Sequence, residues 1–449
     1  MNQIISNDNK ISTFKNHWEG PVLFTERFNT LFQSGDASGL MKFLEHFSRT
    51  HPLYRDLIRQ AYNLTAQIGI SSLANECARI YTETCTKLLK IGRTEFGLPT
   101  IFEFNHRNEM HSELVEQAAF TKILLQLGKL TVKPVLSSPT IHDNPFLKAF
   151  LPYLNECFEI IPPDSNANVA ISQIARFAPY VPLFYKFSNS QYGHNSHFII
   201  DCYSDLVAKD IEPYPFVINE STIETARIFL KPFAISEKDD FVVFYLREEG
   251  YFDSTTPNEA RINVEEYTQA INYFLQKGLK VVRLGHSKMQ AMDEQTGLID
   301  LTNIEKPYEV DIYLCAKAKL YFGSGSGPIS LARNFGIPCC ETACIDFSGN
   351  KPNSLSQYLL FQDAVTAKQC TFSQFKSLGL VSNFSLEPFI SRDILPSFPN
   401  SEANLEFAKE SLDFSIAFGN SSKNKNYSTQ KTTFNILGDV SSSSLPLLQ

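Results

Sequence analysis

The sequence lacks the short motifs that identify most nucleotide- or metal-dependent enzymes. It contains no GxxxxGK[ST], which excludes a Walker-type ATPase, and no GxGxxG, which disfavours a nicotinamide or flavin fingerprint. HExxH, GxSxG and carboxylate–metal motifs are also absent. We therefore expect neither a metal nor a bound cofactor.

Basic charge and long apolar runs are missing too. The 449 residues carry 40 Lys and Arg against 48 Asp and Glu, a net charge of −8, which argues against nucleic acid as the main partner. No run approaches the roughly 20 apolar residues of a membrane span. The N-terminus, MNQIISNDNK, lacks the basic and apolar regions of a secretory signal. We expect a cytoplasmic protein, with peripheral attachment to the inner membrane face as an alternative.

The nine cysteines are scattered and include no CxxC pair. The closest group, Cys339, Cys340 and Cys344, lies around a predicted strand rather than in a ligand loop. This spacing disfavours zinc and predicts buried thiols in a reducing compartment.

The first part of the chain has the apolar periodicity of helices. Apolar residues recur at helical spacing in Gly39–Phe47, Tyr54–Ile68 and Leu73–Leu89, which predicts two or three antiparallel helices. We interpret them as a helical cap. Docking of a partner protein on these helices is the less favoured alternative.

A strand–helix alternation then predicts a first α/β domain. Its predicted elements are strand Thr100–Phe104, helix His111–Leu127, a weak strand Thr131–Leu136 with Pro134 inside it, helix Phe146–Leu154 and strand Phe158–Ile161. The stretch Pro179–Pro215 is rich in aromatic residues and proline, and its pattern predicts no topology.

A second α/β domain is more sharply patterned. Phe241–Leu246 (FVVFYL) is a continuous apolar run, typical of a strand buried on both faces. Asn263 and Glu266 form a capping-box pattern before the next helix. Further strands are Leu279–Leu284, Leu298–Leu301, Leu320–Phe322 and Pro338–Cys344, with a helix over Asp311–Ala318. This order predicts a parallel, doubly wound sheet with the turns after Leu246, Leu284 and Phe322 on one rim.

One of these turns has the composition of an anion site. Gly323-Ser324-Gly325-Ser326-Gly327 joins a strand to a helix that Pro328 opens and Gly336 closes. Glycines let the backbone approach a ligand, and unpaired amides, the helix dipole and the two serine hydroxyls attract phosphate. Taken alone, such a turn is more often only a tight connection between a strand and a helix.

Two arginines strengthen the phosphate hypothesis. Arg247 and Arg283 each stand at the end of a predicted buried strand on the same rim, and guanidinium groups bind phosphate bidentately. For either one, an ion pair with Asp253, Glu248 or Asp311 is the alternative. Their convergence with a Gly-Ser helix start favours a diphosphate.

Several short motifs follow one another along the chain from Arg247 to Leu412. They are Arg247…Tyr251-Phe252…Arg261-Ile262-Asn263…Tyr267-Thr268-Gln269-Ala270-Ile271…Gly278…Val282-Arg283-Leu284-Gly285, Phe322–Gly327, Phe335–Pro338, Asp363…Lys368 and Ser401–Leu412. In order and spacing they resemble a family of bacterial GT-B glycosyltransferases associated with surface-polysaccharide biosynthesis. The domain is also similar to the donor domain of fucosyltransferase-like GT-B enzymes, in which an arginine after the first strand and a Ser-rich helix start hold the donor diphosphate.

The resemblance implies an α/β, GT-B-like fold with two Rossmann-like domains facing a cleft and an extra N-terminal helical segment. The chain would divide into a flexible N-terminus (1–20), a helical cap (21–95), an N-terminal Rossmann-like acceptor domain (96–235), a C-terminal Rossmann-like donor domain (236–360), C-terminal helices that pack back (361–415) and a Ser- and Asn-rich tail (416–449).

The resemblance also implies an activity: inverting, metal-independent transfer of a hexosyl or deoxyhexosyl group from a nucleoside-diphosphate sugar to a hydroxyl of a glycan, lipid-linked sugar or protein. The donor-binding residues would be Arg247, Arg283, Gly285, Tyr308, Gly323, Ser324, Gly325, Ser326 and Gly327. A non-catalytic binding or scaffold protein and a sugar-nucleotide epimerase are the alternatives.

In such enzymes the acceptor and the general base come from the first domain. His106, Glu109, His111 and Glu113 stand at its first strand–helix junction, and a histidine with a near-neutral pKa suits proton abstraction. We favour His111, followed by Glu113. Near the donor rim, Asp253 and Glu249 compete with them. For His106 and Glu113, a plain polar turn or helix-start residue is the favoured alternative. For Tyr308 and Asp311, which we consider for contact with the base or ribose, a solvated helix start is an equal alternative.

Overall fold

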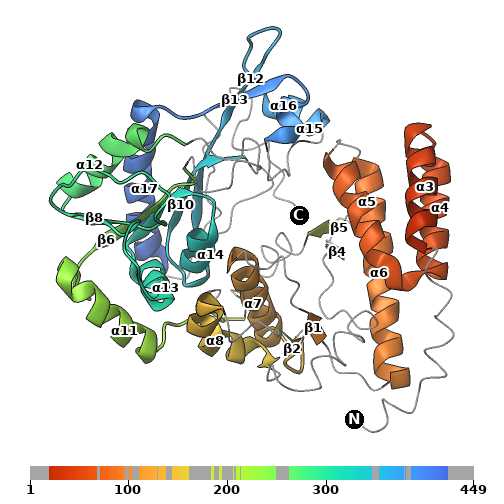
Figure 1. Cartoon of the computed structure of the whole chain (residues 1–449), viewed down its shortest axis with the longest axis horizontal. Helices are drawn as coiled ribbons and strands as arrows, with labels where there is room; N and C mark the ends of the chain where they lie inside the picture. The colour runs from red at the N-terminus through yellow and green to blue at the C-terminus, as the bar shows by residue number, and fades with distance from the viewer. Residues whose placement is uncertain are drawn as a thin grey trace.

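The computed structural model describes residues 20–67, 71–96, 101–103, 111–128, 130–137, 144–160, 184–186, 192–194, 206, 209–212, 214–248, 262–345, 353–378, 380 and 386–422. Within these ranges the chain forms a helical bundle, two parallel sheets with flanking helices, and two small antiparallel sheets of two strands each (Figure 1).

The helical bundle occupies the N-terminal part of the described chain. It consists of α3 (Gly20–Gln33), α4 (Ala37–Thr50), α5 (Arg55–Gln67) and α6 (Ser71–Phe96), with a short 3₁₀ turn η2 (Pro52–Tyr54) before α5. Asp36 caps α4 by accepting a 2.8 Å hydrogen bond from the backbone N–H of Gly39. The helices bury a core of their own around Leu44, Phe47 and Cys77. Figure 1 shows α3 and α4 on the outer side of α5 and α6.

The first α/β unit follows the predicted alternation. Its parallel strands lie in the order β1 (Ile101–Glu103), β2 (Val135–Ser137) and β3 (Glu159–Ile160), with α7 (His111–Gln126) and α8 (Pro145–Cys157) between them. β2 begins after Pro134, because proline lacks the N–H that a strand ladder needs. A hairpin of β4 (Phe184–Lys186) and β5 (Tyr192–His194) falls where the sequence predicted no topology, and α6 packs on it.

The second unit is a six-stranded sheet, and every strand pair in it is parallel. The strands are β6 (Phe241–Tyr245), β7 (Lys280–Arg283), β8 (Leu298–Asp300), β9 (Leu320–Ser324), β10 (Cys339–Cys344) and β11 (Ser354–Tyr358). Their order is β11-β10-β9-β6-β7-β8, so the chain moves outward from β6 to β8 and then returns to the other side of β6. The predicted doubly wound sheet is confirmed.

Helices cover both faces of this sheet, as the continuous apolar run in β6 predicts. Val242, Phe244 and Leu246 pack toward α12 (Thr268–Gln276) and α17 (Ser401–Ser422). The alternate residues of β6 belong to a second core with α11 (Glu220–Leu230), α13 (Tyr308–Lys317) and α14 (Gly327–Asn334). A 3₁₀ turn, η4 (Lys231–Phe233), connects α11 to the sheet.

The two α/β units are joined by this second core. It continues from α13 and α14 into α7 and α8, where Phe150 and Tyr153 contact the Phe216 ring at centroid distances of 5.5 and 5.7 Å. The end of α17 also returns to the first unit, with Phe418 packed on Tyr214 and α7. One apolar core therefore holds the facing helices of both units together.

Several local predictions differ from the structure, and two of them concern the second unit. The helix predicted after Asn263 begins as a 3₁₀ turn, η5 (Val264–Tyr267). Asn263 caps it by accepting from the N–H of Glu265 at 3.0 Å. The Glu266 carboxylate accepts instead from the Ser401 hydroxyl at 2.6 Å, so the predicted capping box is not closed. β9 continues to Ser324, beyond the predicted end at Phe322, because residues 323 and 324 pair with β10.

A small structure follows β11. The antiparallel strands β12 (Leu360–Asp363) and β13 (Ile394–Ser397), with α15 (Phe372–Ser377) and α16 (Glu387–Ile390), enclose a core that includes the stacked rings of Phe361 and Phe389. The eight cysteines in the described ranges are buried, and none forms a disulfide. No helix in the described part of the chain has the length and apolarity needed to cross a membrane.

Candidate functional site

The candidate site lies where the strand order of the six-stranded sheet reverses. β6 and β9 are neighbours, but the chain leaves them in opposite directions along the sheet. Because all six strands are parallel, their carboxyl ends meet at one edge, and ligands of such sheets bind outside the carboxyl ends at a reversal of strand order. The segments at this point are the residues after β6 and the Gly-Ser turn between β9 and α14.

Gly323 allows β9 to lie against β6 at this point. Its φ is +151°, and a Cβ at this position would lie 1.9 Å from the backbone oxygen of Tyr245. Only glycine fits such an approach. Gly323 is therefore needed for the pairing of β9 with β6, and its predicted contact with a ligand stays a prediction.

The N-terminus of α14 lies at this edge, and its N-cap residue does not cap it through its side chain. Ser326 occupies the N-cap position, its side chain makes no capping bond, and Pro328 lies in the first turn. The first amides of a helix have no partner within the helix, and its dipole places positive potential at this end. The segment from Gly325 to Pro328 is thus suited to an anion.

The two serine hydroxyls fix the shape of the turn. The Ser324 hydroxyl accepts a 2.7 Å hydrogen bond from the backbone N–H of Arg247, which ties the segment after β6 to the end of β9. Tyr321 donates its only hydroxyl proton to the Ser324 carbonyl at 2.7 Å. The Ser326 hydroxyl, 3.3 Å from the Tyr321 oxygen, must then donate to it. Ser324 keeps its own proton for a further acceptor, whereas Ser326 uses its proton within the turn.

Arg247 lies at this edge, as predicted. It follows β6, its side chain is partly buried, and its N–H contact with Ser324 places it beside the start of α14. The structure therefore brings together Arg247, Ser324 and the uncapped helix end, three of the features from which the sequence predicted a diphosphate site.

Arg283 corrects one expectation. It ends β7 as predicted, but its side chain is fully buried and does not face the rim. Its guanidinium forms two ion pairs, with Glu248 at 2.6 Å and Asp300 at 2.7 Å. Glu248 is one of the partners considered from the sequence, whereas Asp300 is not. The only signal in the sequence for Asp300 as a partner was that it is an acidic residue near the end of the apolar strand LIDL.

Gly285 and Tyr308 have packing contacts in the structure. A Cβ on Gly285 would lie 2.2 Å from the Met289 sulfur, so glycine lets the segment after β7 fold back on itself. Tyr308 begins α13 and packs edge-on against Phe146 of α8, with ring centroids 5.7 Å apart. A ligand contact by either residue stays a prediction.

Asp311 lies on α13, and burial raises the pKa of its carboxyl group. Its Oδ1 lies 3.4 Å from the Nζ of Lys306, an ion pair that lowers the pKa and so opposes the effect of burial. This pair gives Asp311 a local partner, and contact with a base or ribose stays a prediction.

Glu341 is a neighbour of the site that the sequence did not indicate as such. It lies on β10, and a Cβ on Gly325 would come within 2.4 Å of its Oε1. Its Oε2 is 3.4 Å from Arg333 of α14, which also lies 3.9 Å from Glu116 of α7. The signal in the sequence that could have indicated Glu341 was its acidic side chain inside an otherwise largely apolar strand, CCETAC.

The predicted catalytic residues are only partly described. His111 and Glu113 stand in the first turn of α7, but their side chains lie outside the described residues. Asp253, Glu249, His106 and Glu109 also lie outside the described residues. The general base therefore stays a prediction. Among the residues that the structure does describe, no cluster of His, Cys, Asp or Glu side chains is arranged to hold a metal ion.

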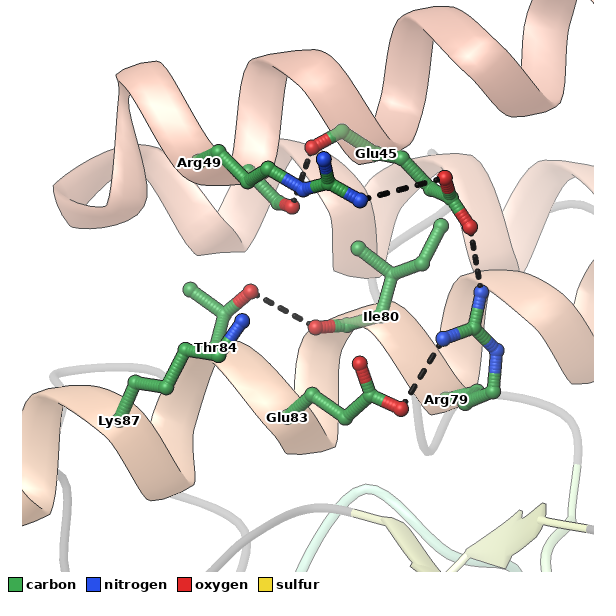
Figure 2. A pocket seen from close by; sticks show the side chains of 8 residues that line it. Glu45, Arg49, Arg79, Ile80, Glu83, Thr84 and Lys87 are labelled. Atoms are coloured by element: carbon green, nitrogen blue, oxygen red, sulfur yellow. Dashed lines mark hydrogen bonds and ion pairs between the residues drawn. The ribbon is translucent and has the colours of Figure 1, made fainter.

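A charged pocket lies elsewhere, between α4 and α6 of the bundle (Figure 2). Arg79 at its edge donates to Glu45, Glu76 and Glu83 at 2.9, 2.7 and 2.9 Å. The bond to Glu45 joins α4 to α6, the other two bonds lie within α6, and together they satisfy the guanidinium. We interpret the pocket as part of the packing of the bundle.

No protein-family model matches the chain, and no curated protein is similar enough to match it. Among solved structures, it is similar to a glycosyl transferase family 9 protein from Veillonella parvula (14% identity, 70% of this chain and 96% of that chain, TM-score 0.42). It is also similar to E. coli ADP-heptose LPS heptosyltransferase II (12%, 58% and 90%, TM-score 0.36) and to Methanocaldococcus jannaschii UDP-GlcNAc 2-epimerase (12%, 67% and 81%, TM-score 0.23). Similarities this distant do not assign an activity.

Proposed function

We propose that this protein is a GT-B glycosyltransferase that binds a nucleoside-diphosphate sugar at the carboxyl edge of the six-stranded sheet. The observation that carries the proposal is the uncapped N-terminus of α14 at the strand-order reversal, beside Arg247 and Ser324. Ligands of doubly wound sheets bind at such reversals, and helix N-termini favour phosphate.

The chemistry follows from the charge of the leaving group. As the acceptor oxygen bonds to the anomeric carbon, the bond from that carbon to the diphosphate breaks and leaves negative charge on the phosphate oxygens. Donors already aimed at that charge lower the barrier without reorganising. In this proposal, the first amides of α14, the Arg247 guanidinium and the Ser324 hydroxyl supply that stabilisation in place of a metal, and the sugar inverts.

The acceptor proton requires a general base, and we favour one from the first unit. His111 is our first choice, followed by Glu113, and Asp253 is the competitor on the donor side. The proton moves from the acceptor hydroxyl to the base as the new glycosidic bond forms. The transferred group is a hexosyl or deoxyhexosyl unit, and the acceptor is a glycan, lipid-linked sugar or protein in the cytoplasm, as in surface-polysaccharide biosynthesis.

A thermal-shift panel of ADP, UDP, GDP, CDP and dTDP tests the donor site. A ligand present at 100 times its Kd adds about 2.7 kcal/mol to folding stability, so one diphosphate should raise the Tm by several degrees. EDTA should not change that shift. A panel with no stabilising member would refute the donor site, and metal-dependent binding would contradict the arginine-based mechanism. Conversion of the donor to an epimer without acceptor would indicate an epimerase.

A further inference from the structure

We propose that Glu248, Arg283 and Asp300 form a buried triad whose role is to position Arg247 for the donor diphosphate. The inference rests on the proposed function, because it assigns Arg283 to the same site as a positioning residue. It replaces the direct contact that the sequence suggested for Arg283.

The triad connects the carboxyl ends of three adjacent strands. Arg283 ends β7, Glu248 follows β6, and Asp300 ends β8. The Arg283 Nη2 donates to Glu248 at 2.6 Å, and its Nη1 donates to Asp300 at 2.7 Å. The Arg283 side chain is 0% exposed, so a ligand cannot reach it in this arrangement.

Backbone groups of the β7–β8 connection interact with the same two carboxylates. The backbone N–H of Gln290 lies beside Glu248 and acts to lower the pKa of its carboxyl group. Asp300 accepts from the N–H of Met292 at 3.0 Å, and from the N–H and hydroxyl of Thr302 at 3.0 and 2.7 Å. The triad therefore holds the segments after β6, β7 and β8 in one arrangement at the edge where the donor would bind.

Arg247 lies between two anchors of this network. Its own N–H is fixed to the Ser324 hydroxyl at 2.7 Å, and the side chain of the next residue, Glu248, is fixed to Arg283. Anchors on both sides restrict the backbone from which the Arg247 guanidinium extends. Such preorganisation reduces the entropy lost when a ligand binds.

The triad is a costly way to obtain stability alone. Desolvating buried charges offsets much of their attraction, and well-packed apolar residues of similar volume are often equally stabilising or better. In addition, the buried Arg283 Nε has no hydrogen-bond partner among the described residues. A network with this cost fits a role in holding geometry.

The two carboxylates differ in how firmly they are ionised. Burial raises the pKa of Glu248, although Arg283 acts in the opposite direction. Burial also acts against ionisation of Asp300, but its hydrogen bonds with Thr302 and Met292 and the Arg283 charge lower its pKa overall. Asp300 therefore anchors Arg283, and Glu248 is the more weakly held link to Arg247.

Glu248→Gln tests the link while keeping the shape of the side chain. The probe is whichever of ADP, UDP, GDP, CDP and dTDP gives the largest thermal shift with the wild-type full-length protein. We expect the Kd of that diphosphate to rise about tenfold, with a higher donor KM and little change in kcat. Asp300→Asn provides a second variant, expected to change Kd in the same direction, in case Glu248→Gln does not fold.

The matched control removes an ion pair at the other end of β7, the strand that Arg283 ends. Asp239→Asn removes the 2.8 Å pair with Lys280, the first residue of β7, at the amino edge of the sheet. It should lower the Tm without changing the Kd. If the Kd changed equally in the control and in Glu248→Gln, the loss of affinity would follow from destabilisation in general. That result would overturn the inference.

A double-mutant cycle with Arg247→Ala separates positioning from other effects. If Glu248 acts through Arg247, then Glu248→Gln should add no further loss of affinity in the Arg247→Ala background. Additive losses would overturn the inference. An effect of Arg247→Ala with none from Glu248→Gln or Asp300→Asn would overturn it but preserve the donor site. Failure of every diphosphate to bind the wild-type protein would remove both proposals.

Discussion

Gly323 is the residue on which the approach of β9 to β6 depends most directly. In Gly323→Ala the new Cβ would meet the Tyr245 backbone oxygen at 1.9 Å, and a backbone atom cannot move aside as a flexible side chain can. We expect a loss of about 2–4 kcal/mol in the free energy of unfolding, from overpacking plus backbone strain. Urea unfolding monitored by circular dichroism measures it.

Gly278→Ala is the control for that substitution. Gly278 has a φ of +80°, but no atom lies within 4 Å of the position its Cβ would take. Only the left-handed backbone should then matter, at a cost of about 1–2 kcal/mol. Equal losses at the two positions would mean that the contact with Tyr245 is not what requires glycine at 323.

At the residue scale, the sequence could not distinguish the two arginines. Both Arg247 and Arg283 follow apolar strands, and both were expected to face one rim. Arg283 proved to be the buried one because Asp300 ends the neighbouring strand and Glu248 reaches back from β6. Those partners are 17 and 35 residues away in the chain. A local pattern therefore placed both arginines at the correct edge but could not tell which side chain meets solvent.

At the element scale, a surface ion pair holds the start of β7. Asp239 bonds Lys280 at 2.8 Å, and the N–H of Ser236 donates to its other oxygen at 2.7 Å. The hydrogen bonds from Lys280 and Ser236 lower the pKa of the Asp239 carboxyl from 3.8 to about 2. Because the folded pKa lies below the unfolded one, this group stabilises the fold above the unfolded pKa and stops doing so as the pH falls through about 2.

Asp239→Asn should therefore destabilise the protein in a pH-dependent way. We expect a loss of about 1 kcal/mol or less at neutral pH, because the pair is near the surface and is screened by solvent. The difference between variant and wild type should shrink as the pH falls below about 4. Unfolding free energies measured over a pH series check this, and a difference that stayed constant with pH would contradict it.

The helices and strands were largely predictable, and their ends less so. The strands β6, β7 and β8 and the helices α7 and α8 occupy the expected positions, because hydrophobic periodicity and caps are local signals. The length of β9 was not predictable. Gly323 and Ser324 have the composition of a turn, yet they pair with β10 because Gly323 lets β9 approach β6 so closely. Tertiary pairing overrode the local preference.

At the scale of the whole molecule, the shared core couples the two α/β units. Phe150 of α8 is 0% exposed and belongs to the core that also contains β6, α13 and α14. Phe150→Ala should cost about 3–5 kcal/mol and increase hydrogen exchange in β6 and α13 as well as in α8. Mass-spectrometric exchange on the full chain measures this.

Phe47→Ala is the matched control, because Phe47 is 1% exposed in the separate core of the helical bundle. Its effect on exchange should be confined to α3–α6. If the effect of Phe47→Ala spread into the six-stranded sheet, the bundle would not have a separate core. If the effect of Phe150→Ala stayed within α8, one core would not couple the two α/β units.

The continuity of that core also determines where the chain could be exchanged with a related protein. A recombination point near residue 235, between the predicted acceptor and donor domains, would separate α13 and α14 from the helices α7 and α8 that cover them. Each product would expose one face of a cut core. A functional hybrid would therefore have to take α7 and α8 from the same parent as the donor half. The packing of Phe418 of α17 in one core with residues of α7 adds a second reason for α7.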